Sequence, residues 1–521
     1  MRVLIFHGYL LGGTGSNVYN ARLAAALVTQ GHEVHLLSQD RHPEKHAFVD
    51  ALGDWDQGAL RVRALHEDVR CTVYRPNIGA LLPVYVADRY EGIEARTFAQ
   101  CSEGEVAFYL DANMEAVREL SELVRPQVAL ANHLVMGPVI LARALEGEVP
   151  YAVKVHGSAL EYTVKPCPGR FLGFAREGVA AARGILVGSR HTAASLWEAI
   201  ADPRLVARTR LGPPGVDVER FSPREAAQAA AGVRAIAASL RVGGSREEGP
   251  ASAFSRDRRA AAEALERLDP DRDRLVAFVG KLIVSKGPDL LLAAWPLVLQ
   301  RVPLARLVVV GFGAYREGLE RLIAALAAGE LDQAREIALL GRALEAGPRA
   351  PRPLGHLLAF LDSLDEAGER ERYLAAARAL DEHVVFTGRL EHDELSELLP
   401  ACEALVVPST FPEAFGMVAA EAAACGVLPI SAAHSGLAEV SEVLARAVPE
   451  QSAEWLSFLL DDYAVKALAE RVVCWLQADP VLRARARAGL VRAVRERWSW
   501  DGVARGVIAA ASGELDALED P

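Results

Sequence analysis

Lysine is scarce in this chain. Only six of its 57 basic residues are lysines, and arginine supplies the rest. Two of the six, Lys281 and Lys286, lie in one short segment. A chain that uses arginine for generic surface charge has little reason to place two lysines so close together. A lysine ammonium is a compact charge suited to phosphate oxygens, so this segment is a candidate anion site, with two ordinary surface lysines as the alternative.

Other scarce features exclude several classes of protein. The six cysteines, at positions 71, 101, 167, 402, 425 and 474, form no CxxC pair, which argues against a disulfide framework and a zinc site. No apolar run approaches the ~20 residues of a membrane span, and the first strand is too short for a signal-peptide core. The net charge of −12 argues against a nucleic-acid partner. We therefore expect a soluble, cytoplasmic protein without an integral membrane segment.

The 521 residues are long for a single hydrophobic core, so two domains are expected. Short Val/Ile-rich runs alternate with helical patterns in both halves, which predicts α/β domains with parallel sheets. The expected strands are 3–6, 34–37, 128–131, 151–155, 184–187, 275–279, 307–310, 384–386, 404–407 and 427–430. The helical patterns include 17–30 and 113–124.

Proline and glycine mark the expected domain boundary. Residues 213–222 have turn chemistry and predict a hinge between a domain of residues 1–212 and a second domain of residues 223–485. Two helical insertions are expected in the second domain, at about 224–267 and 314–381. An arginine-rich helical tail, 486–521, completes the chain. A basic helix can lie on a membrane, but a solvated helix face is the preferred interpretation.

The segment from Pro408 to Glu421 is the most informative in the chain. It follows the apolar run 404–407 and opens an alanine-rich helical pattern. A strand that turns into a helix directs free backbone N–H groups at whatever lies beyond it, which creates an anion site. Glu413 and Glu421 flank this turn. At helical rise, eight residues span roughly 12 Å, enough to hold both ends of an elongated ligand with an anionic middle. The alternative is two solvated carboxylates near a helix start.

The sequence from Glu413 to Glu421, E-A-F-G-M-V-A-A-E, resembles the signature of the retaining glycosyltransferases of family four. The resemblance implies the GT-B fold, in which two Rossmann-like domains face a central cleft, and a final helix that returns to the N-terminal domain. It also implies a donor site formed by Glu413, Glu421 and the amides of Phe415, Gly416, Met417 and Val418. Lys281 and Lys286 resemble the basic pair that holds the donor diphosphate, although the family usually has arginine at the first position.

Further candidates are at the ends of other expected strands. Gly12 and Gly13 follow the first strand and resemble a donor-phosphate loop. A dinucleotide fold is the alternative, but its expected acidic residue is at best Asp40. The resemblance implies that His156 contacts the transferred sugar and that Arg389 lies near the nucleotide base. His133, Tyr85 and Arg89 are candidates for the acceptor side, the last two because aromatic and arginine residues concentrate there.

These features predict transfer of a glycosyl group from a nucleotide diphosphate sugar to an acceptor hydroxyl, with retention implied by the resemblance. We expect His156, Glu413 and Lys286 to be catalytic. No Asp-x-Asp follows a strand, so the leaving charge is expected to be met without a metal or other cofactor. A UDP sugar is the expected donor only because it is the commonest. The acceptor, a small molecule, a saccharide or a lipid, is not readable.

The alternatives on the same fold are a nucleotide-sugar epimerase, a phosphorylase and a non-catalytic nucleotide-sugar binding protein. A nucleotide-dependent oxidoreductase is the alternative from another enzyme class. A phosphorylase that uses pyridoxal phosphate would need a buried lysine, for which this chain has few candidates.

Overall fold

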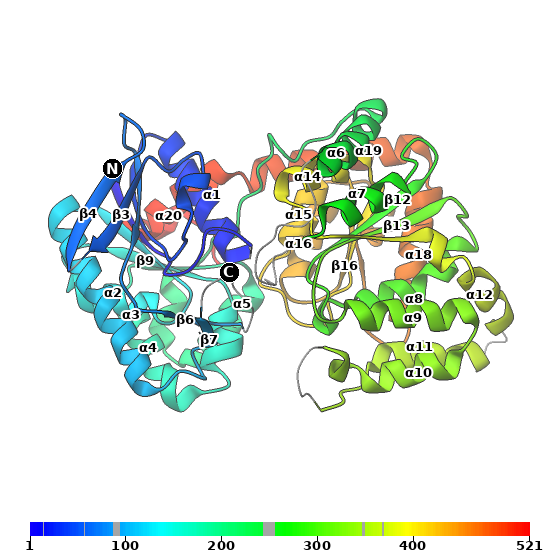
Figure 1. Cartoon of the computed structure of the whole chain (residues 1–521), viewed down its shortest axis with the longest axis horizontal. Coiled ribbons are helices and arrows are strands. Elements are labelled where there is room, and N and C mark those ends of the chain that lie inside the picture. Colours follow the sequence, from blue (N-terminus) through cyan, green and yellow to red (C-terminus); the bar gives the residue numbers. More distant parts are fainter. Residues whose placement is uncertain (14, 57, 87–93, 243–255, 346–349, 367–368) are drawn as a thin grey trace. The chain divides into compact units, whose positions relative to one another are not determined.

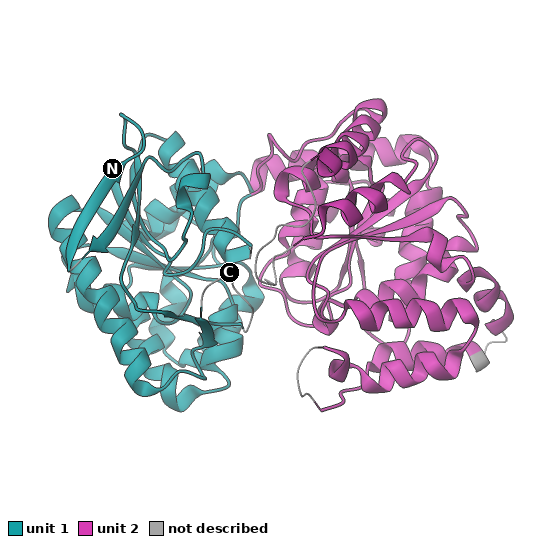
Figure 2. Ribbon diagram, viewed as in Figure 1, with its two compact units in different colours: residues 1–215, 498–521 teal, residues 216–497 magenta. Residues whose placement is uncertain are grey.

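The chain forms two units, each built on its own mainly parallel β-sheet (Figure 2). Unit 1 comprises residues 1–215 and 498–521, and unit 2 comprises residues 216–497. This computed structural model describes residues 1–13, 15–56, 58–86, 94–242, 256–345, 350–366 and 369–521. The hinge proposed at 213–222 contains the boundary between the units. Residues 486–497, proposed as part of the returning tail, belong to unit 2.

The sheet of unit 1 has the strand order β11-β10-β9-β8-β1-β2-β5-β3-β4, and its strands are parallel except at the β3–β4 hairpin. Two further strands, β6 and β7, pair separately. The strands are β1 (Arg2–Phe6), β2 (Glu33–Leu37), β3 (Ala51–Asp56), β4 (Ala59–Ala64), β5 (Cys71–Arg75), β6 (Leu81–Val84), β7 (Glu94–Thr97), β8 (Val128–Asn132), β9 (Tyr151–Val155), β10 (Gly184–Val187) and β11 (Thr209–Leu211).

Helices cover both faces of this sheet (Figure 1). They are α1 (Gly15–Thr29), α2 (Glu103–Val124), α3 (Gly137–Leu145), α4 (Pro168–Ala180), α5 (Arg190–Ile200) and α20 (Trp500–Ser512). Helix α20 packs on α1 and on strands β8, β9 and β10. Its buried residues, among them Val507 and Ala510, join the apolar core formed by β1, β2 and α1. The end of the chain therefore completes the core of unit 1.

Unit 2 is built on a fully parallel sheet with the strand order β14-β13-β12-β15-β16-β17. Its strands are β12 (Arg274–Val279), β13 (Ala305–Val310), β14 (Val384–Gly388), β15 (Ala404–Val407), β16 (Leu428–Ala432) and β17 (Ser457–Phe458). Most of their side chains are buried. This burial explains why the strands read as continuous apolar runs in the sequence.

In Figure 1, α8 and α9 lie on one side of this sheet and α6, α14 and α15 on the other. The helices are α6 (Ala226–Val242), α7 (Arg258–Glu266), α8 (Pro288–Leu299), α9 (Arg316–Ala328), α10 (Leu331–Leu340), α11 (Gly355–Glu366), α12 (Arg370–Ala377), α13 (Leu380–His383), α14 (His392–Leu398), α15 (Met417–Ala424), α16 (Ser435–Ala445), α17 (Glu450–Ala453), α18 (Ala464–Gln477) and α19 (Pro480–Arg497). Helices α6 and α7 belong to the first proposed insertion, whose Gly/Ser-rich centre lies outside the described residues, and α9 to α13 belong to the second.

Candidate functional site

The sheet order of unit 2 brings the two most informative segments together. Strands β12 and β15 are neighbours, and the chain leaves β12 toward β13 on one side and β15 toward β16 on the other. Ligands of open parallel sheets bind at such switch points, beyond the carboxyl ends of the strands. The Thr410 amide donates to the Ser285 carbonyl, 2.9 Å away. A Cβ on Gly287, whose φ is +63°, would lie 2.1 Å from the Pro408 carbonyl oxygen, so the contact requires glycine there.

Lys286 and Glu413 form an ion pair across this contact. The Ser409 hydroxyl donates a second hydrogen bond to the same Glu413 oxygen, at 2.6 Å. Burial alone would raise the pKa of Glu413, but the attraction and hydrogen bond of Lys286, together with the Ser409 bond, hold that pKa below its usual value. The carboxylate is therefore ionised at neutral pH. It is a strong acceptor for hydroxyl groups.

Glu421 lies deeper, with only 3% of its surface exposed. Its carboxylate accepts a hydrogen bond from His392 Nε2 at 3.0 Å, and the His392 ring packs edge-on against Phe221. The sequence did not single out His392. The roughly 12 Å estimate for the Glu413–Glu421 span was wrong in its premise, because α15 begins only at Met417. Residues 413–416 form a loop, and only the part from Met417 to Glu421 rises as a helix, by about 6 Å.

The start of α15 supplies backbone donors. The Gly416 carbonyl is the first intrahelical acceptor and receives the amides of Ala419 and Ala420. The amides of Met417 and Val418 precede that first bond, where a helix leaves its N–H groups for external acceptors. The pattern of strand, glycine turn and helix is thus an anion-binding geometry.

Two other donor-side candidates have partners of their own. The Lys281 ammonium lies 6.0 Å from the centre of the Phe312 ring. Arg389, which follows β14, pairs with Glu391 at 3.0 Å. Both residues lie at the same carboxyl edge of the sheet as the Lys286–Glu413 pair.

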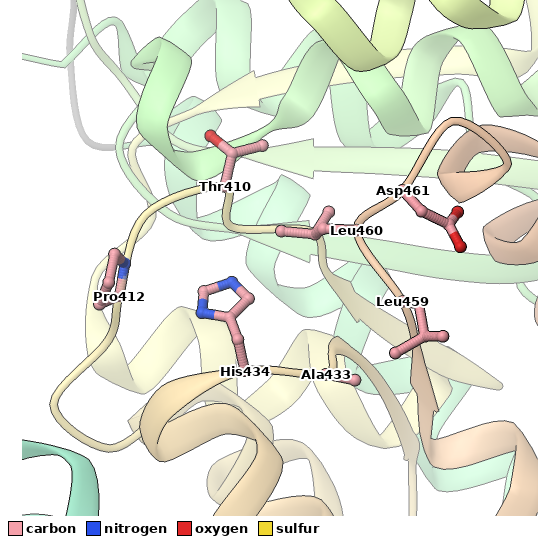
Figure 3. A pocket seen from close by; sticks show the side chains of 7 residues that line it. All are labelled: Thr410, Pro412, Ala433, His434, Leu459, Leu460 and Asp461. Carbon is pink, nitrogen blue, oxygen red and sulfur yellow. The ribbon is translucent and has the colours of Figure 1, made fainter.

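The loop 408–412 also borders a pocket of about 510 Å³. Its lining residues come from the ends of β15, β16 and β17: Thr410, Pro412, Ala433, His434, Leu459, Leu460 and Asp461. Figure 3 shows the His434 ring between Pro412 and Leu460, while the Asp461 side chain points away from that ring. This pocket was not predicted from the sequence, because its walls come from three loops spread over about 50 residues.

The glycine-rich turn of unit 1 has a local anchor. Gly12 and Gly13 are exposed, and Gly13 has a φ of +91°. The Leu11 amide donates to the Asp40 carboxylate at 2.9 Å. Asp40 thus holds the turn itself, rather than being left for the ribose of a dinucleotide.

Three histidines meet beside this turn, at the ends of β1, β8 and β9. The ring centre of His133 lies 5.9 Å from that of His7 and 4.9 Å from that of His156. Tyr85 packs on His133 at 4.2 Å, and its hydroxyl donates to the Val135 carbonyl. The structure thus brings together His133, His156 and Tyr85, which were proposed from separate segments. Arg89 lies outside the described residues.

These rings are held in the uncharged state. Burial lowers the pKa of His7 to about 4 and, together with the neighbouring histidines, lowers those of His133 and His156 well below the usual value. Asn132 fixes the tautomer of His156: its amide nitrogen donates to the Phe6 carbonyl, so its oxygen accepts from His156 Nε2 at 2.8 Å. In the neutral ring, Nδ1 then carries the lone pair.

The described residues contain no group of three or more His, Cys, Asp or Glu side chains placed to hold a metal ion. None of their helices is long and apolar enough to cross a membrane.

Comparison with known proteins places these features in a family context. Residues 364–489 match the family model for glycosyl transferases group 1. The curated D-inositol 3-phosphate glycosyltransferase of Segniliparus rotundus is 31% identical over 258 residues, which cover 49% of this chain and 43% of that protein. The Frankia alni protein of the same name is 28% identical over 386 residues, covering 73% of this chain and 72% of its own. The chain spans about half or less of the length of the first three curated relatives.

Solved structures share the fold. Sucrose-phosphate synthase from Thermosynechococcus elongatus superposes with a TM-score of 0.57 at 18% identity and covers 99% of both chains. Anabaena Alr3699/HepE in complex with UDP and glucose has a TM-score of 0.54 at 15% identity, covering 98% of this chain and 99% of its own. These likenesses confirm the predicted fold class, GT-B, with its two Rossmann-like domains.

Proposed function

Because the chain belongs to the group 1 glycosyltransferases, we propose that it transfers a glycosyl group from a nucleotide diphosphate sugar to an acceptor hydroxyl, with retention of anomeric configuration. The observation that carries this proposal is the Lys286–Glu413 ion pair beside the start of α15. It brings together a cation, a carboxylate that accepts hydrogen bonds from hydroxyl groups, and the N-terminal amides of a helix, all at the switch point of one sheet. A nucleotide sugar needs these three partners for its diphosphate and its sugar.

On unit 2, each part of the donor has a proposed partner. Lys281, Lys286 and the amides of Met417 and Val418 bind the diphosphate, where the helix dipole adds to the attraction. Glu413 accepts hydrogen bonds from hydroxyls of the transferred sugar. Glu421, already bonded to His392, accepts from the ribose hydroxyls at the other end.

The chemical step is a same-face substitution. The bond from the anomeric carbon to the phosphate oxygen breaks, and a bond from that carbon to the acceptor oxygen forms. The departing phosphate takes the acceptor's proton. The Lys286 ammonium stabilises the leaving group most at this moment, because the charge on the leaving oxygen is then largest.

We assign the residues of unit 1 to the transferred sugar and the acceptor. His156 stays neutral, because burial and its neighbours lower its pKa, and it presents Nδ1 as a hydrogen-bond acceptor for a sugar hydroxyl. His133 and Tyr85 are assigned to the acceptor side, and Gly12 and Gly13 to a close backbone approach to the donor phosphates.

The identity of the substrates follows from relatives only as a proposal. A solved relative holds UDP and glucose, which favours a UDP sugar as donor. The curated relatives act on inositol phosphate by name, which favours a small polyol or saccharide as acceptor. No metal enters the scheme, and turnover is expected to persist in excess chelator.

Calorimetry with UDP, GDP, ADP and dTDP, and with their glucose conjugates, tests the donor site. Glu421→Ala removes a buried charge-assisted hydrogen bond worth about 1.5–3 kcal/mol, so donor affinity is expected to fall about 10- to 150-fold. Glu336→Ala, at an exposed position on α10, is the control. Unchanged affinity in Glu421→Ala would refute the ribose assignment. Donor binding by the wild type without turnover on polyol or saccharide acceptors would favour a binding protein instead.

A further inference from the structure

A second segment, the start of α16, determines where Glu413 lies. The chain leaves β16 and enters α16 through His434, Ser435 and Gly436. Ser435 has a φ of +50°, a conformation that costs a non-glycine L-residue roughly 1 kcal/mol or more. Serine at this position carries a strain that glycine would not have, so the question is what its hydroxyl does there.

Directed hydrogen bonds connect this segment to the motif loop. His434 Nε2 lies 2.7 Å from the Ser409 carbonyl, which can only accept, so Nε2 carries a proton. In the neutral form of the ring, Nδ1 then accepts from the Ser435 hydroxyl at 3.0 Å. The same hydroxyl oxygen accepts the backbone amide of Glu413 at 2.9 Å. Every donor and acceptor in this chain of bonds therefore has a defined direction.

The backbone carbonyl of Glu413 is hydrogen-bonded to α16 as well. The Gly436 amide donates to the Glu413 carbonyl at 3.0 Å. A Cβ on Gly436 would lie 2.7 Å from the backbone of Ala414 and Phe415, so the loop rests directly on the helix start. Glu413 thus has its amide and its carbonyl fixed by two successive residues of α16.

We propose that Ser435, oriented by His434, is a positioning residue that sets the Glu413 carboxylate for the transferred sugar. This inference rests on the proposed function, in which Glu413 contacts that sugar, and names the residue that aims it. Because the Ser435 hydroxyl bonds to Glu413, the residue assigned to the sugar, its loss is expected to affect recognition of the sugar and not of the nucleotide.

Ser435→Gly separates this role from a structural one. It removes the hydroxyl and the strain together, so the unfolding midpoint is expected to stay equal or rise. The preference for UDP-glucose over UDP, measured by calorimetry as the ratio of their dissociation constants, is expected to fall about fivefold to tenfold for one lost hydrogen bond. Affinity for UDP alone is expected to stay within about twofold. A merely structural role cannot lower sugar recognition while leaving stability intact.

Two further variants control the experiment. Ser441→Ala removes a hydroxyl from the inner face of the same helix, where it donates to the Leu456 carbonyl, and is expected to leave the ratio unchanged. Glu413→Gln combined with Ser435→Gly is expected to be no worse than Glu413→Gln alone, because both changes act through one carboxylate.

The possible outcomes distinguish a failure of the Ser435 positioning role from a failure of the proposed function. A wild-type preference for UDP-glucose that survives in Ser435→Gly refutes the positioning role and leaves the proposed function in place. A wild-type chain that binds no nucleotide sugar refutes the proposed function and this inference with it.

Discussion

At the scale of single residues, Lys154 is a lysine buried in the interior of unit 1. It is 1% exposed, its ammonium donates to the Gly212 carbonyl at 2.5 Å, and it lies 5.4 Å from the centre of the Tyr19 ring. Burial lowers its pKa to about 7. Among the few lysines of the chain, one is therefore an interior group whose charge depends on pH near neutrality.

This burial predicts a pH dependence of stability. An unfolded lysine has a pKa of about 10.4. Between pH 7 and pH 10 the unfolded chain therefore holds a proton that the folded chain has released, and stability rises with pH. Lys154→Met removes this titration. The unfolding free energy of the wild type relative to Lys154→Met is expected to grow by about 2 kcal/mol from pH 7 to pH 9.

Urea denaturation at several pH values measures this difference, and any pH-independent cost of orphaning the Gly212 carbonyl cancels from it. Lys45→Met, at an exposed lysine of the same unit, is the matched control. A difference that stays flat between pH 7 and pH 9 would show that Lys154 keeps its charge inside the fold.

The residue scale also shows what the sequence could and could not predict about the site. Glu413, Glu421 and Lys286 were proposed because each belongs to a local motif. His392, Ser435 and Asn132 were missed because they act on residues 22 to 29 positions away, through loops that only the sheet order brings together. Strand-end polar residues were their only sequence signal. The ion pair of Lys286 with Glu413 joins residues 127 positions apart, and only the family resemblance assigned both to one site.

At the scale of elements, α19 shows how an arginine-rich helix is held to a sheet. Glu403, just before β15, accepts from Arg274 at 3.0 Å, Arg483 at 2.9 Å and Arg487 at 2.6 Å. Its backbone carbonyl accepts from the Trp475 indole at 2.7 Å. Arg483 and Arg487 of α19 are thus partners of one carboxylate, and not only a solvated basic face.

Glu403→Gln is therefore expected to destabilise unit 2. It leaves three guanidinium groups around a neutral amide, a loss of about 2–3 kcal/mol when the exposure of the partners is taken into account. Denaturant titration measures it. Glu496→Gln, on the exposed face of α19, is expected to change stability by less than about 0.5 kcal/mol. Equal effects of the two variants would show that solvent already screens the cluster.

Helices and strands could be predicted where their buried side chains form an apolar pattern in the sequence. Most core strands of both sheets, such as β9 and β15, were predicted within a residue or two, but the buried strand β5 was missed. The β3–β4 hairpin was missed, because β4 is exposed along almost its whole length and so has no apolar pattern of its own. Helix α2 begins ten residues before its expected start, at a capping box of Ser102 and Glu105. The helical tail is divided into α19 and α20, and Ser499 caps the second of these helices.

At the scale of the whole molecule, unit 1 is assembled from two distant parts of the chain, whereas unit 2 is continuous. Helix α20 lies so close to β10 that a Cβ on Gly184 would be 2.7 Å from the Ala510 carbonyl oxygen. Beyond the helix, the Glu519 carbonyl accepts the Leu211 amide at 2.8 Å. Folding of unit 1 is therefore coupled to the last residues of the sequence.

Deletion of residues 498–521 is expected to unfold unit 1 selectively. The segment buries Trp498, Val507 and three alanines of α20. At about 1.5–3 kcal/mol for each large apolar side chain, their loss approaches the 5–15 kcal/mol that stabilises a domain. Hydrogen exchange measured by mass spectrometry should show rapid exchange in β1, β8 and β9, with β12 and β15 still protected.

Deletion of 514–521 alone keeps α20 and is the milder control. A synthetic peptide of residues 498–521 is expected to restore protection in unit 1. Equal loss of protection in both units would mean that they fold as one cooperative body, and the tail would then stabilise the whole chain.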